Sequence, residues 1–106
     1  MARRRYFAHT NPDGFGPNYL VRQAGYTLPS YYGTEPDANN IESIGGGYPT
    51  AEATWQGWMD LSGHRDHLLG LDSFWAEQIE YGVGYAYDPT SPYRHYWVVI
   101  TAKPGP

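Results

Sequence analysis

The stretch Ile79–Tyr87, with the sequence IEYGVGYAY, decides the fold of this chain. Apolar or aromatic side chains occupy every second position and small or polar ones alternate with them, which predicts a β-strand. The turn signal Asp88–Pro92 follows, and Arg94–Ala102 is expected to return as a second strand. The chain should therefore end in an antiparallel hairpin. The glycines on one face of the first strand indicate close approach by a neighbouring element.

Helix signals precede this hairpin. Thr50 is a favourable N-cap residue for a helix that should run to about Asp60. Ser62 is expected to cap a second helix, which continues through Leu69 and ends at Gly70. The spacing of apolar residues in the first of these helices predicts a buried stripe made of Ala51, Trp55, Trp58 and Met59.

Prolines and glycines organise the first half of the chain. The turn signal Asn11–Gly14 precedes a short predicted helix over Pro17–Ala24, and Tyr26–Asp37 reads as a loop. A short strand is expected over Ile41–Ile44, before a run of three glycines. The buried face of the helix should carry Leu20, Val21 and Ala24. The whole pattern predicts one α+β domain over residues 1–106, with helices covering a small antiparallel sheet.

Composition narrows the possible function classes. The net charge is −4 and Lys103 is the only lysine, so we expect no nucleic-acid partner. Three of the seven basic residues form the run Arg3–Arg5, which is more typical of a solvated helix end. The absence of cysteine excludes disulfides, thiolate metal sites and thiol nucleophiles. No apolar run is long enough for a transmembrane segment, and the first residues lack the pattern of a signal peptide.

Three residues distant in sequence are candidates for a common site. His9 lies in the phrase Phe7–Gly14, His64 lies in the phrase Gln56–Arg65, and Glu42 lies between them. Imidazole and carboxylate groups both bind metal ions and exchange protons near neutral pH, so such a cluster would suit a divalent cation or proton transfer. At a helix N-terminus His64 should be neutral, because the positive end of the helix dipole disfavours the imidazolium ion.

Other histidines and the tryptophans favour structural roles. His67 follows His64 at a helical spacing that would suit a metal, but the neighbouring leucines favour ordinary packing. His95 lies among strand aromatics and is expected to be structural or to line a rim. The four tryptophans are expected in the core first and as a ligand platform second: Trp55, Trp58, Trp75 and Trp97.

Four phrases, in order, resemble the CAP superfamily of cysteine-rich secretory, antigen 5 and pathogenesis-related-1 proteins, whose domain is also called SCP. The resemblance is to its bacterial, cysteine-free branch. The first phrase, FAHTNPDG, carries the family's first cleft histidine onto His9, and the second, QGWMDLSGHR, carries the other onto His64. The closing hairpin is represented by YGVGYA and HYWVV. The resemblance covers nearly the whole chain and implies an α-β-α sandwich around a small antiparallel sheet.

Two departures from the family pattern concern the cleft and the N-terminus. The family's Gly-Glu-Asn-Ile-Ala phrase corresponds to Ile41–Gly45, which keeps the acid at Glu42. A second acidic cleft residue has no counterpart, and Asp60 is the nearest substitute. Met1–Tyr6 looks like only the last turn of the family's long first helix. We therefore expect a chain truncated at its N-terminus, or an uncovered apolar region through which it forms a homodimer.

The resemblance and the candidate residues together leave three functional hypotheses. The first is a non-catalytic, extracellular or cell-surface module whose cleft binds a small polar ligand or a divalent cation, zinc above all, through His9, Glu42 and His64, with Asp60 as a further ligand. The second is a hydrolase, in which His9, Glu42 and His64 act with a metal-bound water, or Ser43 or Ser62 acts as nucleophile. The third is a sterol- or lipid-binding module that uses aromatic surface instead of histidines.

Overall fold

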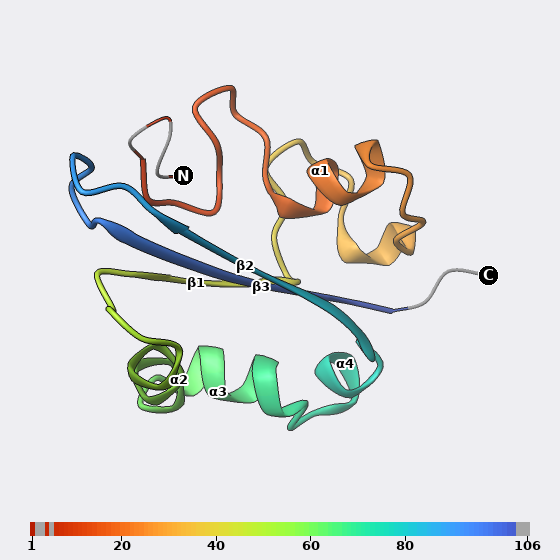
Figure 1. Ribbon diagram of the computed structural model, residues 1–106. Coiled ribbons are helices and arrows are strands. Elements are labelled where there is room, and N and C mark those ends of the chain that lie inside the picture. Colours follow the sequence, from red (N-terminus) through yellow and green to blue (C-terminus); the bar gives the residue numbers. More distant parts are fainter. Residues whose placement is uncertain (2–3, 5, 104–106) are drawn as a thin grey trace.

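The computed structural model describes residues 1, 4 and 6–103, arranged in three layers (Figure 1). A small sheet lies between α1 (Pro17–Gln23) and the 3-10 turn η1 (Ser30–Tyr32) on one face and three helices on the other. These three helices are α2 (Ala51–Met59), α3 (Ser62–Leu69) and α4 (Ser73–Ala76). The expected α+β class is confirmed. Within the described residues, no helix is both long and apolar enough to span a bilayer.

The sheet consists of three antiparallel strands in the order β1-β3-β2. They are β1 (Glu42–Gly46), β2 (Glu80–Tyr87) and β3 (His95–Ala102). The predicted hairpin forms β2 and β3, with Val83 opposite Val99, and Ser43 of β1 lies opposite Val99 on the other side. Because β3 is central, β1 and β2 are both edge strands.

The helix signals of the second half are largely correct. The Thr50 side chain accepts a hydrogen bond of 3.1 Å from the backbone N–H of Ala53 at the start of α2. Gly70 ends α3 in the left-handed conformation, with a φ of 63°. Ser62 was expected to be the N-cap of α3, but it is the first helical residue, and Leu61 occupies the N-cap position without a side-chain cap. The short helix α4 was not predicted.

Helix α1 is where predicted, but of its predicted buried face only Val21 packs against the core cluster. Leu20 and Ala24 are exposed, whereas Asn18 is completely buried. The backbone N–H of Asn18 donates to the carbonyl of Ala38, and its side-chain amide donates to the carbonyl of Tyr32 and to Asn40 Oδ1, both at 3.0 Å. The polar side of α1 is therefore turned inward, because it holds the loop that leads into β1.

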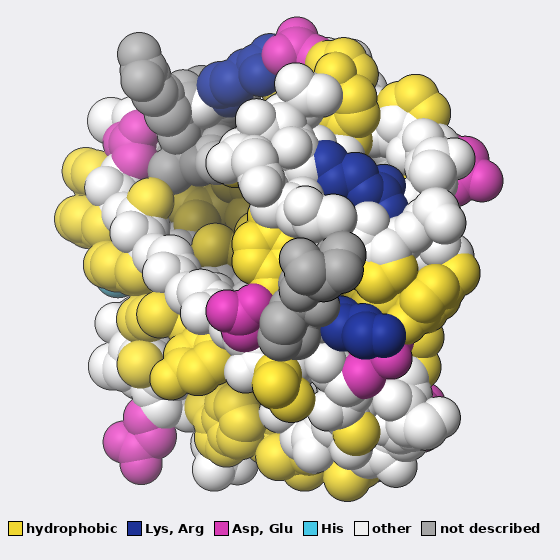
Figure 2. Space-filling model, turned by 90° about the vertical axis from the view of Figure 1, so that its right-hand side faces the viewer, with side chains coloured by type: hydrophobic (Ala, Val, Ile, Leu, Met, Phe, Trp, Pro, Cys, Tyr) yellow, Lys and Arg dark blue, Asp and Glu magenta, His cyan; other side chains and the backbone are white. Residues whose placement is uncertain are grey.

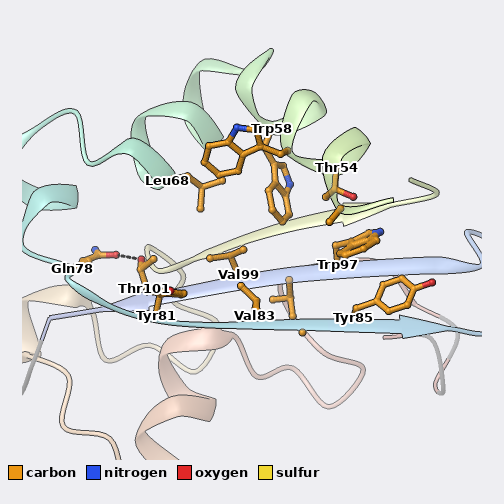
Figure 3. A pocket seen from close by; sticks show the side chains of 14 residues that line it. Thr54, Trp58, Leu68, Gln78, Tyr81, Val83, Tyr85, Trp97, Val99 and Thr101 are labelled. Carbon is orange, nitrogen blue, oxygen red and sulfur yellow. Dashed lines mark hydrogen bonds between the residues drawn. The ribbon is translucent and has the colours of Figure 1, made fainter. Parts of the chain in front are cut away.

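The core lies mainly on the α1 side of the sheet, where Leu28, Tyr32, Ile41 and Ala102 form a buried cluster. The other side of the sheet, which faces α2 and α3, is covered less completely. A groove of about 730 Å³ lies between α2 and α3 and the strands β2 and β3 (Figure 3). Leu68 approaches the groove from α3, and Val83 and Val99 lie on its strand side. The apolar face of β2 therefore remains open.

Two expectations about burial are met only in part, that of a buried stripe on α2 and that of a closely covered glycine face on β2. Tyr81 is 77% exposed and Val83 is 73% exposed, and Trp55 of the predicted buried stripe is also exposed. The glycine face of β2 is not closely covered at Gly82, around whose position there is open space, whereas Gly84 lies against Val98. Hydrophobic side chains are also exposed in several groups on the face of the molecule shown in Figure 2.

The structure describes only part of the N-terminal segment for which expectations were stated. Arg3 and Arg5 lie outside the described residues, as does half of the segment Met1–Tyr6 that was expected to be the last turn of a first helix. Arg4 is described, and its guanidinium forms an exposed ion pair of 3.0 Å with Asp13. This contact holds the predicted turn at Asn11–Gly14 against the start of the chain.

Candidate functional site

The candidate site is built around the edge strand β1. Glu42 and Ser43 are neighbours on this strand, so their side chains point to opposite faces of the sheet. Glu42 Oε1 lies 2.8 Å from His9 Nδ1, which donates the hydrogen bond because a carboxylate only accepts. This hydrogen bond joins β1 to the segment around His9, which lies 33 positions earlier in the sequence.

On the other face, Ser43 lies between two histidines of α3. Its Oγ is 2.9 Å from His64 Nδ1 and 2.8 Å from His67 Nδ1. The two histidines are three residues apart and therefore on the same side of the helix. Ser43 itself is 1% exposed, which makes it a buried connection and not a surface group.

Glu42, Ser43 and His64 all line one hollow at the β1 edge, with a volume of about 340 Å³. His67 and the amides of Asn39 and Asn40 also contribute to its wall. His9 does not line the hollow, but contacts its wall through Glu42. The structure therefore brings the three predicted residues together around a strand edge, with His9 and His64 approaching from opposite faces.

The electrostatics of the site favour neutral imidazoles on α3. Burial lowers the pKa of His64, and the nearby His9 lowers it further. For His67, burial and the proximity of His64 and then His9 lower the pKa to about 4. Both rings are therefore neutral at pH 7 and keep a lone pair on one nitrogen.

Two further candidates lie away from the hollow. Asp60 is exposed at the C-cap of α2 and does not line the hollow, so the structure does not bring it together with the other three residues. Ser62 is also exposed and does not line the hollow, so it is not placed as a nucleophile. Over residues 1, 4 and 6–103, no three His, Asp or Glu side chains are already arranged to hold a metal ion.

The sequence reasoning missed the groups behind the histidines. His67 is buried, as its leucine neighbours suggested, but both of its ring nitrogens are hydrogen-bonded. Its Nε2 lies 2.6 Å from Thr101 Oγ1, which in turn donates to Gln78 Oε1 at 2.5 Å. The spacing from His64 to His67 was the only feature of the sequence that pointed to this network. Thr101 and Gln78 belong to no local motif, and only the fold brings them next to His67.

Comparison with known proteins found no significant match: no family model, no curated protein and no solved structure matches this chain. The resemblance to the CAP superfamily accordingly rests on the four quoted phrases.

Proposed function

We propose that this protein is a CAP-like, non-catalytic binding module whose hollow at the β1 edge takes a divalent cation or another small polar ligand. The observation that carries the proposal is the convergence of His9 on Glu42 and of His64 on Ser43, two neighbouring positions of one edge strand. The extracellular or cell-surface location implied by the resemblance belongs to the same proposal.

The hydrogen bonds of the two histidines support this function. Each ring has its Nδ1 occupied, by Glu42 in the case of His9 and by Ser43 in the case of His64. Metal-binding histidines characteristically have one ring nitrogen held in this way, which orients the other toward the metal. The Nε2 atoms of both rings are then the donor atoms for a ligand, and Glu42 can join them only by giving up its hydrogen bond with His9, because a carboxylate bonded to Nδ1 lies too far from a metal on Nε2 of the same ring.

Zinc is the cation that this donor set favours. Two imidazole nitrogens and one carboxylate oxygen leave a fourth position for water. Because the three groups are not already gathered as a cation site in the described residues, binding of zinc by all three requires the His9 ring to move and to release Glu42. The neutral His64 favours such binding, since no proton must first be removed from its ring.

Calorimetric zinc titration tests the proposal. The wild type should bind one zinc ion, and His64→Ala and Glu42→Gln should each weaken binding at least tenfold. His95→Ala is the matched control, because His95 is bonded to Tyr85 Oη and stacks between strand tyrosines, away from the hollow. No zinc binding by the wild type, or equal loss in the His95 variant, would contradict the cation-binding proposal.

A hydrolase is the second candidate, favoured by the contact of Ser43 with His64. The burial of Ser43 weakens this hypothesis, since a nucleophile must reach its substrate. Turnover of chromogenic esters and peptides that is abolished in Ser43→Ala would favour the hydrolase over the binding module.

The open groove supports two proposals about partners. The first is a homodimer: the apolar face of the edge strand β2 is exposed, so two copies can pack these faces together and cover each other's grooves. The second is the sterol or lipid ligand, for which a groove of about 730 Å³ offers enough space. Lipid that remains bound through purification, detected by mass spectrometry, would favour the second.

A further inference from the structure

We propose that Ser43, His67, Thr101 and Gln78 are positioning residues that hold His64 with its proton on Nδ1 and its lone pair on Nε2. This inference deepens the proposed function and rests on it for its purpose, since it names the His64 atom that meets the ligand. It follows from the direction of four consecutive hydrogen bonds.

The direction of these four hydrogen bonds is set at Gln78. The side-chain amide nitrogen of Gln78 donates to the backbone carbonyl of Asn40 at 3.1 Å, which leaves the amide oxygen facing Thr101. The opposite orientation would place two acceptor oxygens against each other at Asn40. An amide oxygen only accepts, so the Thr101 hydroxyl donates its single proton to Gln78. Figure 3 shows this bond at one end of the groove.

The same reasoning passes along the chain of bonds to His67. Since the Thr101 proton is used, Thr101 Oγ1 must accept from His67 Nε2, 2.6 Å away. His67 is 6% exposed, and its low pKa keeps it neutral at pH 7, so its ring carries no second proton. His67 Nδ1 therefore holds a lone pair and accepts from the Ser43 hydroxyl.

His64 is the last member of the chain. The Ser43 hydroxyl has given its proton to His67, so its oxygen accepts from His64 Nδ1 at 2.9 Å. A neutral His64 then has no proton on Nε2, and this nitrogen is a lone-pair donor for a cation or an acceptor for a ligand N–H or O–H. Without such a chain an imidazole in water favours the opposite tautomer, with the proton on Nε2.

Nitrogen NMR of the histidine rings tests the proposal in the full chain at pH 7.5, without added metal. The wild type should show His64 protonated on Nδ1 and His67 protonated on Nε2. Ser43→Ala should move His64 toward the Nε2-protonated form, and Ser62→Ala, an exposed serine on the same helix, should leave it unchanged.

A second pair of variants tests the remote end of the chain of bonds. Thr101→Val removes the hydrogen-bond acceptor of His67 Nε2. Its effect should reach His64 through Ser43 and change the tautomer of His64. Thr101→Ser retains the hydroxyl and should restore the wild-type spectrum, which a loss of packing would not do. Wild-type His64 protonated on Nε2, or a folded Thr101→Val with unchanged His64, would overturn the proposal.

The tautomer measurement does not depend on ligand binding. If His64 has the expected tautomer and no zinc binds, the proposed function fails and the positioning role stands. If zinc binds at His64 and the tautomer is the opposite one in the free protein, the positioning role fails alone.

Discussion

At the scale of single residues, the proposed binding site depends on which histidine nitrogens are hydrogen-bonded. Glu42 and Ser43 each hold one imidazole, although they are adjacent in sequence, because a strand directs neighbouring side chains to opposite faces. The edge position of β1 lets His64 line the hollow while His9 contacts its wall through Glu42. A central strand would have kept them on separate sides of the sheet.

His67 makes stability depend on pH. Its pKa is lowered to about 4 in the folded protein, whereas an unfolded histidine titrates near 6.5. Between these values the unfolded chain binds a proton that the folded one does not, so stability is complete above about pH 6.5 and falls as pH falls toward 4. Urea unfolding at pH 4.5 should give a free energy of unfolding roughly 2–3 kcal/mol below that at pH 7.5 from this group.

The variant His67→Gln is the control for this measurement. It keeps every carboxylate and His64, so it reports the pH dependence that does not come from His67. The stability of the variant should fall less than that of the wild type over the same interval. An equal fall in both proteins would show that His67 is not the group responsible.

At the scale of elements, the ends of helices and strands were easier to predict than their faces. Thr50, Gly25 and Gly70 act through local backbone geometry, and each marks a boundary close to the one expected. Faces depend on what lies opposite. The inward side of α1 carries Asn18 because a loop crosses it, and no local pattern in the sequence could reveal that loop.

In the candidate site, too, some residues could be identified from the sequence and others only from the fold. The imidazoles and Glu42 were recognisable by residue type and by the resemblance, and the fold brings them together. Thr101 and Gln78 are ordinary residues by type, and they matter only because β3 and the segment before β2 pass behind α3. Asp60 was taken as the nearest substitute for the family's second acidic cleft residue, but it is exposed at the C-cap of α2.

Helix α2 contacts the edge strand that carries the candidate site. A variant at the N-cap of α2 tests how much this helix contributes to stability. The Trp58 indole N–H donates to the Ile44 carbonyl of β1 at 2.9 Å, which joins helix and edge strand. Thr50→Ala removes the cap of this helix and should lower the free energy of unfolding by about 1 kcal/mol. Thr27→Ala, at an exposed loop position, is the matched control and should change it little.

In that experiment, chemical unfolding gives the free energies directly. Equal stability of the two variants would mean that the Thr50 hydrogen bond to Ala53 contributes nothing to the folded state.

At the scale of the whole molecule, the two faces of the sheet are unequally covered. The side that faces α1 contains the buried cluster, whereas the side that faces α2 and α3 leaves a groove with exposed tyrosine and valine side chains of β2. Such a continuous apolar surface favours association. The hollow at β1 lies at the other edge of the sheet, so association through β2 leaves it accessible.

Sedimentation velocity over a range of concentrations tests this association. The wild type should shift toward a dimer as its concentration rises, and Val83→Lys should remain monomeric, because it places a charge in the apolar interface. Gln56→Lys, at an exposed position on α2 outside the groove lining, makes the same change of +1 in net charge and is the control. A wild type that stays monomeric at all concentrations would contradict the proposed homodimer.

The central claim is that His9, Glu42 and His64 form one binding site, and a crystal structure grown with zinc tests it most directly. Anomalous scattering should place one zinc ion at the β1 edge, about 2.0–2.1 Å from Nε2 of His9 and from Nε2 of His64. Zinc bound elsewhere on the protein, or no zinc between the two rings, would contradict the claim.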